Sequence, residues 1–274
     1  MDKIYIQTYS VIADYMQDFR GTMRRIAETG YDGVEFAAGY GGLSPAELKA
    51  FLDEIGLTAI STHVGLDNAL ENIEMMQAVG AKYIICPGTH MPDLESTLAA
   101  AKKMNEIGAA CKDAGLKFGY HNHTQEFNVY DGKFCLDILM ENTDPDKVIM
   151  ELDAGWACCA GINVEEYIQK HAGRVELIHA KECRQVVGVT PMVDWASFPK
   201  DENGRPIMPD WFKKLSEAGD LANGPTGQGL INWASLKKTA DAQGTRAYIV
   251  EREYDYQGDI WKCIAEDLAY LRTV

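Results

Sequence analysis

Short runs of β-branched and aromatic residues alternate along the chain with longer stretches in which apolar residues recur at helical spacing. Runs of this kind are typical of strands buried in a parallel sheet, and the stretches between them are typical of amphipathic helices. Eight such runs occur, at Lys3–Thr8, Gly33–Ala38, Thr58–Val64, Tyr83–Pro87, Leu116–His121, Lys147–Asp153, Val175–Lys181 and Arg246–Glu251.

The segment SPAELKAFLDEIG shows why the intervening stretches are predicted to be helices. Ser44 can cap the helix N-terminus, Pro45 suits the first helical position, and Glu47 completes a capping box. Gly56 follows the end of the segment, where a left-handed residue closes many helices. Glycines stand at the same point, one to three residues before the next run, at Gly30, Gly80 and Gly115.

Strands that alternate with helices favour a parallel sheet, and eight such units favour a closed barrel. We therefore predict an α/β fold, a (β/α)8 TIM barrel that forms one domain over residues 1–274. A doubly wound sheet is the alternative, but no GxGxxG or GxxxxGK[ST] motif follows any of the runs.

The spacing is irregular only between the seventh and eighth runs. Residues 182–230 contain Trp195, Trp211 and several prolines and glycines, but no clear strand. Long loops in compact domains are usually functional, and at this position the loop would lie over the C-terminal mouth of the barrel. We predict an active-site loop insertion that acts as a lid or pocket wall, with a helical stretch at Pro209–Ala218.

Polar side chains gather where the predicted strands end. In barrels of this type the active site lies at the C-terminal strand ends. Imidazoles and carboxylates that converge on one mouth are suitable ligands for a divalent metal, and this mixture favours Mn²⁺, Mg²⁺ or Co²⁺ over a structural zinc. The residues concerned are His63, His121, Asn122, His123, Glu126, Asp153, His179, Lys181 and Glu251.

Three further carboxylates compete with these choices. Side chains alternate along a strand, so Glu151 points to the same side as Asp153, and Glu253 to the same side as Glu251. Asp153 and Glu251 are the preferred ligands because they lie at the strand tips. A third competitor, Glu35, is expected to cap the barrel interior.

Composition narrows the choice of partners and location. The net charge of −15 would repel a phosphate backbone, so no nucleic acid is expected as a partner. No apolar run approaches the ~20 residues that a membrane helix needs, and the acidic start of the chain does not resemble a signal peptide. Seven scattered cysteines indicate reduced thiols and a cytoplasmic location.

Seven motifs in order along the chain resemble those of the xylose-isomerase-like TIM-barrel superfamily. This group includes sugar phosphate isomerases and epimerases, inosose dehydratases and endonuclease IV. The resemblance covers nearly the whole chain. Its carriers are YDGVEF, STHVG, YHNHTQEF, ELDAGW, HAKE, GQGLINW and IVERE.

The resemblance implies one divalent metal held by Glu, Asp, His and Glu from successive strand ends. Asp153, His179 and Glu251 match the last three ligands. The chain has His121 where many members have the first Glu, so the fourth ligand is open between Glu126, His121 and His123. Glu126 is the first choice because a hard cation gains more from a carboxylate than from a second imidazole. Mn²⁺ is the expected ion, with Mg²⁺, Co²⁺ and Zn²⁺ as alternatives.

The endonuclease IV branch does not fit the residues. Its trinuclear zinc site needs additional histidines, and this chain has Cys86 and Trp156 at two of the positions concerned.

Three functions remain for the predicted site. The first is a sugar or keto-sugar isomerase or epimerase that works through an enediolate, with Glu251, Glu126 and His123 as acid–base groups and Lys181 at the oxyanion. The second is a keto-sugar or cyclitol dehydratase or lyase, similar to inosose dehydratase. The third is a non-catalytic sugar-binding barrel.

The substrate is expected to be a small unphosphorylated sugar or cyclitol, because no phosphate cradle is visible in the sequence. His63, His121, Lys181 and Trp156 are the predicted substrate contacts. The sequence leaves a homo-oligomer open.

Overall fold

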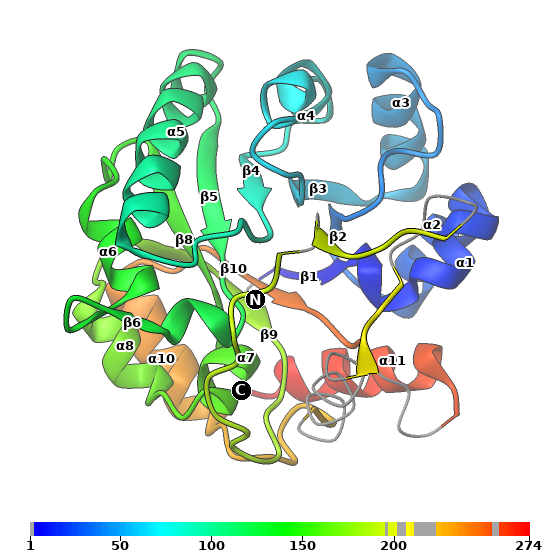
Figure 1. The fold of residues 1–274 in the computed structure, drawn as a ribbon. Helices are drawn as coiled ribbons and strands as arrows, with labels where there is room; N and C mark the ends of the chain where they lie inside the picture. Colours follow the sequence, from blue (N-terminus) through cyan, green and yellow to red (C-terminus); the bar gives the residue numbers. More distant parts are fainter. Residues whose placement is uncertain (1–2, 195–196, 202–206, 211–222, 254–257) are drawn as a thin grey trace.

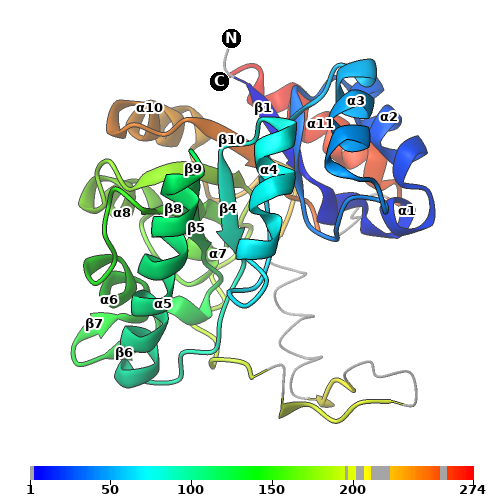
Figure 2. The ribbon, with the colours of Figure 1, turned by 90° about the horizontal axis from the view of Figure 1, so that it is seen from above.

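The computed structural model describes residues 3–194, 197–201, 207–210, 223–253 and 258–274. Eight parallel strands form one sheet in the order β3-β2-β1-β10-β9-β8-β5-β4. A parallel bridge between His63 and Ile85 joins the two end strands and closes the sheet on itself. The predicted (β/α)8 barrel is therefore confirmed, with helices on the outside of the strands (Figures 1 and 2).

Each barrel strand lies inside one of the eight predicted runs and is shorter by one or more residues at its ends. The short hairpin between β5 and β8, formed by Val129–Tyr130 (β6) and Lys133–Phe134 (β7), was not predicted. The barrel strands are β1 Ile4–Gln7, β2 Gly33–Phe36, β3 Thr58–Thr62, β4 Tyr83–Cys86, β5 Lys117–His121, β8 Val148–Asp153, β9 Val175–Ala180 and β10 Ala247–Val250.

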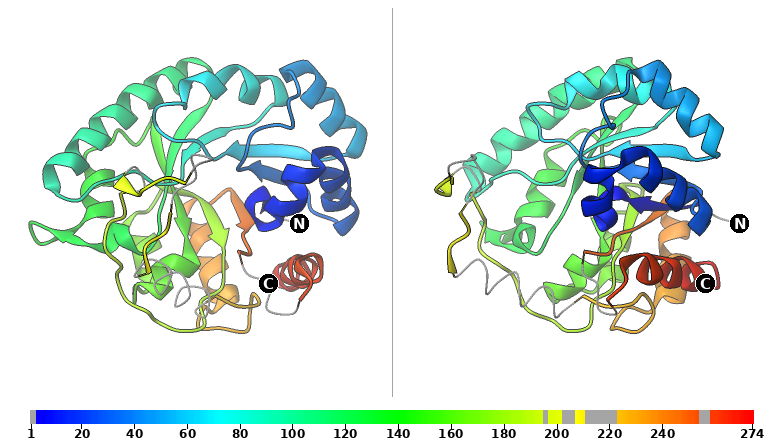
Figure 3. Two further views of the ribbon diagram at one scale, coloured as in Figure 1. Left: turned by 45° about the vertical axis from the view of Figure 1, so that its right-hand side comes forward. Right: turned by 90° about the vertical axis from the view of Figure 1, so that its right-hand side faces the viewer.

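Helices connect successive strands around the outside of the barrel (Figure 3). Among the described residues, no helix combines the length and apolar character needed to cross a bilayer. The helices are α1 Ile12–Gln17, α2 Phe19–Thr29, α3 Pro45–Ile55, α4 Ile73–Val79, α5 Leu94–Asp113, α6 Cys135–Glu141, α7 Ala154–Cys159, α8 Val164–Lys170, α10 Trp233–Gln243 and α11 Ile260–Leu271, with 3-10 turns at Thr8–Val11, Leu70–Asn72 and Gln125–Phe127.

The start of α3 has the predicted capping box. The Ser44 backbone N–H donates to Glu47 Oε2 at 2.9 Å, and the Glu47 backbone N–H donates to Ser44 Oγ at 3.4 Å. Gly56 ends the helix in the left-handed region with φ 73°. The same left-handed conformation occurs at the other three predicted helix ends, Gly30, Gly80 and Gly115.

The inward face of the strands changes character along the barrel. On β8 the inward residues are Ile149, then Glu151 and Asp153. The lower residue belongs to an apolar cluster that fills the barrel interior, whereas both carboxylates are fully buried above it. β9 and β10 repeat this order, so apolar side chains fill the N-terminal half of the barrel and ionisable side chains crowd its C-terminal half. The cluster comprises Tyr5, Ile60, Tyr83, Ile85, Ile149, Leu177, Ala247 and Ile249.

The first part of the long loop runs over segments that follow the strands. The Val187 backbone N–H donates to the Cys159 carbonyl at 2.9 Å, and Thr190 Oγ1 lies 2.7 Å from Thr124 Oγ1. Residues 182–194 therefore lie at the C-terminal face of the barrel, and their role as an active-site loop stays a prediction. Trp195, Trp211 and most of the predicted helix at 209–218 lie outside the described residues.

Candidate metal centre

Nine ionisable side chains from six strands meet at the C-terminal mouth of the barrel. Five are carboxylates and one is an ammonium, so four negative charges remain in excess when the three imidazoles are neutral. Burying such an excess is costly unless protons or a cation compensate it. The nine are Glu35, His63, His121, Glu151, Asp153, His179, Lys181, Glu251 and Glu253.

Four of these side chains form what we call the upper group: His121, Asp153, His179 and Glu251. One ligand atom from each lies within 4.8 Å of the others. His179 Nδ1 is 3.1 Å from Glu251 Oε2 and 3.9 Å from Asp153 Oδ2, and His121 Nε2 is 3.9 Å from the same Asp153 oxygen. They come from the ends of β5, β8, β9 and β10, which are neighbours in the sheet.

A second set lies deeper in the barrel, and we call it the lower group: His63, His121, Glu151 and His179. His63 Nε2 donates to Glu151 Oε2 at 2.6 Å and lies 3.0 Å from Glu35 Oε1. His179 Nε2 donates to the same Glu35 oxygen at 2.7 Å. The lower group is therefore held together by contacts of hydrogen-bond length.

Lys181 places its ammonium beside the upper group. Lys181 Nζ is 2.8 Å from Glu251 Oε2, 3.1 Å from Glu253 Oε2 and 3.4 Å from Asp153 Oδ2. The same nitrogen lies 4.6 Å from the centre of the Trp156 ring. Lys181 thus supplies one positive charge to three carboxylates and packs against an aromatic wall.

The three imidazoles respond differently to burial and to their neighbours. Burial opposes the charged form of His63, but Glu35 and Glu151 outweigh it and raise the pKa of His63 to about 10. Burial also opposes the charged form of His179, and Glu151 and Glu35 raise the His179 pKa well above its usual value. The pKa of His121 is well below its usual value because of burial and of the nearby His179. Protons are therefore concentrated on the two rings that face Glu35.

The pKa values of the carboxyl groups at the mouth depend on how close each group lies to the Lys181 ammonium. Burial raises the pKa of Asp153 to about 6, partly offset by Lys181. At Glu251 burial is outweighed by Lys181, which holds the Glu251 pKa well below its usual value. Burial also raises the pKa of Glu253. Asp153 is therefore a fully buried carboxyl that its present neighbours only partly neutralise.

Two observations indicate that a metal ion fits the upper group: the types of ligand atom that it offers, and one oxygen of Asp153. Asp153 Oδ1 accepts a hydrogen bond from the Trp156 backbone at 2.7 Å, whereas Asp153 Oδ2 is buried without a hydrogen-bond partner among the described residues. That second oxygen faces the upper group. Two imidazoles and two carboxylates around a buried, anionic point suit a divalent ion. The residues present therefore fit the ion that the family pattern implies.

The structure places Glu126 beside the upper group's strand but outside both groups. This residue is fully buried in the 3-10 turn Gln125–Phe127, where Oε1 accepts from Tyr120 Oη at 2.9 Å and Oε2 accepts from the His123 backbone at 2.7 Å. It belongs to neither group. Both oxygens already accept hydrogen bonds that hold the turn after β5, and His121 rather than Glu126 stands in the upper group. Glu126 as the fourth ligand therefore stays a prediction, with His121 as the alternative that this geometry favours.

The other predicted site residues lie around the same mouth. His123 packs near the Trp156 ring, with ring centres 6.0 Å apart, and its Nδ1 is buried without a hydrogen-bond partner among the described residues. His63 does not point to open space, because its Nε2 is shared between Glu35 and Glu151. Substrate contacts at His63, His121, Lys181 and Trp156 stay predictions.

Glu35 and Glu151 take a larger part in the mouth than their positions in the sequence indicate. The sequence predicts Asp153 as a ligand in preference to Glu151, and Glu35 as a cap of the barrel interior. Both join the ionisable cluster, because β2 and β8 bring their inward faces to the same depth as His63 and His179. Strand parity indicated which way they point, but the depth of each strand in the barrel depends on its register.

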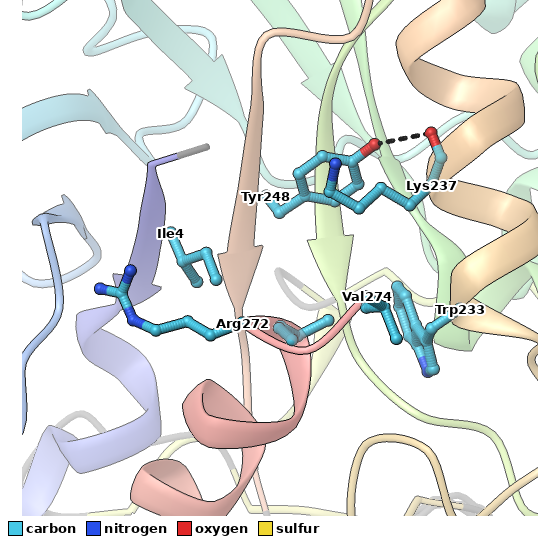
Figure 4. A pocket seen from close by; sticks show the side chains of 7 residues that line it. Ile4, Trp233, Lys237, Tyr248, Arg272 and Val274 are labelled. Atoms are coloured by element: carbon cyan, nitrogen blue, oxygen red, sulfur yellow. Dashed lines mark hydrogen bonds between the residues drawn. The ribbon is translucent and has the colours of Figure 1, made fainter. Parts of the chain in front are cut away.

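A pocket lies at the N-terminal end of the barrel, away from the ionisable cluster. It lies beside the starts of β1 and β10 and the C-terminal end of α11, and the Tyr248 hydroxyl on its wall donates to the Lys237 carbonyl at 3.3 Å (Figure 4). None of the candidate site residues lines it. The lining residues are Ile4, Trp233, Lys237, Tyr248, Leu271, Arg272 and Val274.

Comparison with known proteins agrees with this geometry. The profile of the xylose isomerase-like TIM barrel matches residues 23–274, and the chain belongs to that family. A curated relative, an inosose dehydratase of Geobacillus kaustophilus, is 25% identical over 202 residues, which cover 63% of this chain and 64% of that protein. The chain thus spans less than two thirds of the length of the curated relatives that it matches.

Solved structures share the fold. A sugar phosphate isomerase/epimerase from Parabacteroides distasonis is 23% identical, covers 100% of this chain and 94% of its own, and has a TM-score of 0.74. The IOLI protein, solved with a bound zinc atom, is 12% identical, covers 97% of this chain and 95% of its own, and has a TM-score of 0.67. At these identities the likeness establishes the fold alone.

Proposed function

We propose that this chain is a divalent-metal-dependent isomerase or epimerase that acts on an unphosphorylated sugar or keto-sugar. The observation that carries the proposal is the upper group, in which four neighbouring strand ends bring His121, Asp153, His179 and Glu251 together. Oδ2 of Asp153, which faces this group, is buried and has no hydrogen-bond partner among the described residues. Mn²⁺ is the proposed ion. Zinc is the alternative that the IOLI structure supports.

The ion, when bound, would polarise the substrate carbonyl and favour removal of a proton from the neighbouring carbon. The chain's own groups would supply the rest. Lys181 would face the developing oxyanion, since its ammonium already lies within 3.4 Å of Asp153 and Glu251 oxygens. Glu253 would move the proton, because its carboxylate is 3.1 Å from Lys181 and keeps partial exposure at the mouth.

The ring of Trp156 would form one wall of the substrate pocket. It lies beside both Lys181 and His123, so a sugar seated against it would meet an ammonium and an imidazole. Aromatic faces of this kind pack against the apolar side of sugar rings. Residues 182–194 would cover the same mouth, as the contacts of residues 187 and 190 with the segments after β8 and β5 support.

Elimination of water is the second candidate, and the relatives favour it. The curated proteins that this chain resembles carry the name inosose dehydratase. Loss of water needs a group that protonates the leaving hydroxyl. His123 could take that part, because its Nδ1 is buried near Trp156 with no hydrogen-bond partner among the described residues.

Proton exchange with solvent distinguishes the candidates. The metal-loaded protein is incubated in D₂O with a panel of keto-sugars and keto-inositols, and the products are followed by NMR and mass spectrometry. Deuterium incorporation without loss of water is expected for an isomerase or epimerase. Incorporation with release of water would replace this proposal by the dehydratase, and binding without exchange would favour a sugar-binding barrel.

A further inference from the structure

Glu35 on β2 has no part in the proposed chemistry, yet it is among the most thoroughly bound carboxylates at the mouth. Oε1 accepts from Gln7 Nε2 and from His179 Nε2, both at 2.7 Å, and Oε2 accepts from Ser61 Oγ at 2.5 Å. Gln7 and Ser61 lie on the two strands that flank β2, in register with Glu35. The carboxylate is therefore clamped from both sides, and its orientation is fixed before any ligand binds.

His179 presents its two ring nitrogens to different surroundings. Nε2 points into the barrel at Glu35, whereas Nδ1 points to the upper group, 3.1 Å from Glu251 Oε2. A metal takes a ring nitrogen that carries no proton, and a metal-bound histidine commonly donates its other N–H to a carboxylate. The bond to Glu35 thus decides which nitrogen of His179 is left for an ion.

We propose that Glu35 is a positioning residue that keeps the proton of His179 on Nε2 and so presents Nδ1 to the metal. This inference rests on the proposed metal site. A carboxylate in this place also raises the basicity of the ligating nitrogen and fixes the plane of the ring. Glu35 acts through His179 and touches neither substrate nor ion.

The alternative for the lower group is a second ion, and the shared rings argue against it. His121 and His179 belong to both groups. Filling both positions would require each ring to bridge two cations through both nitrogens. The contacts of 2.6–3.0 Å among Glu35, His63 and Glu151 are instead ordinary lengths for hydrogen bonds to carboxylates. A single ion in the upper group, with the lower group held together by hydrogen bonds, accounts for all of these ring nitrogens and carboxylate oxygens.

The test uses metal-stripped full-length protein titrated with Zn²⁺, a diamagnetic probe. Affinity is measured by competition with a chromophoric chelator for the wild type, Glu35→Gln and Glu176→Gln. Glu176 is the matched control, a buried glutamate on β9 that pairs with Tyr83 and Lys117 toward the other end of the barrel. Glu35→Gln is expected to weaken zinc binding about 10- to 100-fold, and Glu176→Gln to leave it unchanged.

A second readout addresses the proton directly. Nitrogen-15 NMR of the histidine rings in zinc-loaded wild type is expected to show His179 with zinc on Nδ1 and hydrogen on Nε2, the signal being assigned by its loss in His179→Asn. This measurement holds even when Glu35→Gln fails to fold. Zinc on Nε2 of His179, wild-type affinity in a folded Glu35→Gln, or two zinc ions per chain would each overturn the inference. A wild type that binds no zinc would instead contradict the proposed metal site.

Discussion

Asp153 uses its two carboxylate oxygens for different purposes. Oδ1 caps α7 by accepting from the Trp156 backbone at 2.7 Å, and Oδ2 faces His121, His179 and Lys181. Because the cap fixes the plane of the carboxylate, Oδ2 is held toward the upper group without help from an ion. Asp153 thus caps the N-terminus of α7 and, through its other oxygen, belongs to the upper group.

The fourth ligand gives the sharpest prediction at the residue scale. His121→Ala is expected to lose most of the metal affinity, because it removes one of four donors from the upper group. Glu126→Gln is expected to retain metal affinity, since its oxygens serve Tyr120 and the His123 backbone. Isothermal titration with Mn²⁺ measures both variants. Loss of the metal in Glu126→Gln together with its retention in His121→Ala would restore Glu126 as the ligand.

The inward faces of β8, β9 and β10 show how much the sequence could predict. Alternation along each strand correctly indicated that Glu151 shares a side with Asp153, and Glu253 with Glu251. The eight strand positions and the glycine helix ends were also predicted, since both depend on local patterns. These features can be predicted without knowing which strands are neighbours in the sheet.

Contacts that cross the barrel could not be predicted in the same way. The hydrogen bond from His179 to Glu35 joins residues 144 positions apart in the chain. Whether these residues meet depends on the register of every strand between them, which the local pattern leaves undetermined. The surroundings of Glu126 could not be predicted for a different reason, because the 3-10 turn after β5 directs its carboxylate to Tyr120.

A buried carboxylate joins α6 to α8 and gives a prediction at the scale of elements. Asp137 accepts from Tyr167 Oη at 2.9 Å, His171 Nε2 at 2.8 Å and Lys170 Nζ at 2.5 Å. Burial alone would raise the pKa of Asp137, but His171 and Lys170 outweigh it and lower the pKa to about 2. The stabilisation from this lowered pKa is complete above the unfolded value of 3.8 and is lost as the pH falls to about 2.

Asp137→Asn is therefore expected to unfold more easily at pH 7, by about 2 kcal/mol. The gap to the wild type should narrow as the pH falls below about 4, where Asp137 of the unfolded wild-type chain begins to take up a proton while the folded carboxylate stays charged down to about pH 2. Urea unfolding at a series of pH values measures this difference in the free energy of unfolding. A gap that stays constant down to acid pH would show that the three hydrogen bonds stabilise the protein independently of the charge on Asp137.

The two halves of the barrel interior differ in the side chains that fill them. Apolar side chains fill the N-terminal half of its interior, and the nine ionisable side chains occupy the C-terminal half. The apolar half excludes water beneath the ionisable cluster, which strengthens each charge interaction above it. The same arrangement leaves an excess of buried negative charge at the mouth, which the proposed divalent cation would offset.

The metal content of the purified protein shows whether the upper group binds an ion. The wild type and Asp153→Ala are stripped with chelator, incubated with Mn²⁺, freed of unbound ion and measured by mass spectrometry, with folding checked by circular dichroism. We expect one ion per wild-type chain and almost none in a folded Asp153→Ala protein, because that variant removes the buried oxygen that faces the upper group. Equal metal content in the two proteins, or none in the wild type, would contradict it.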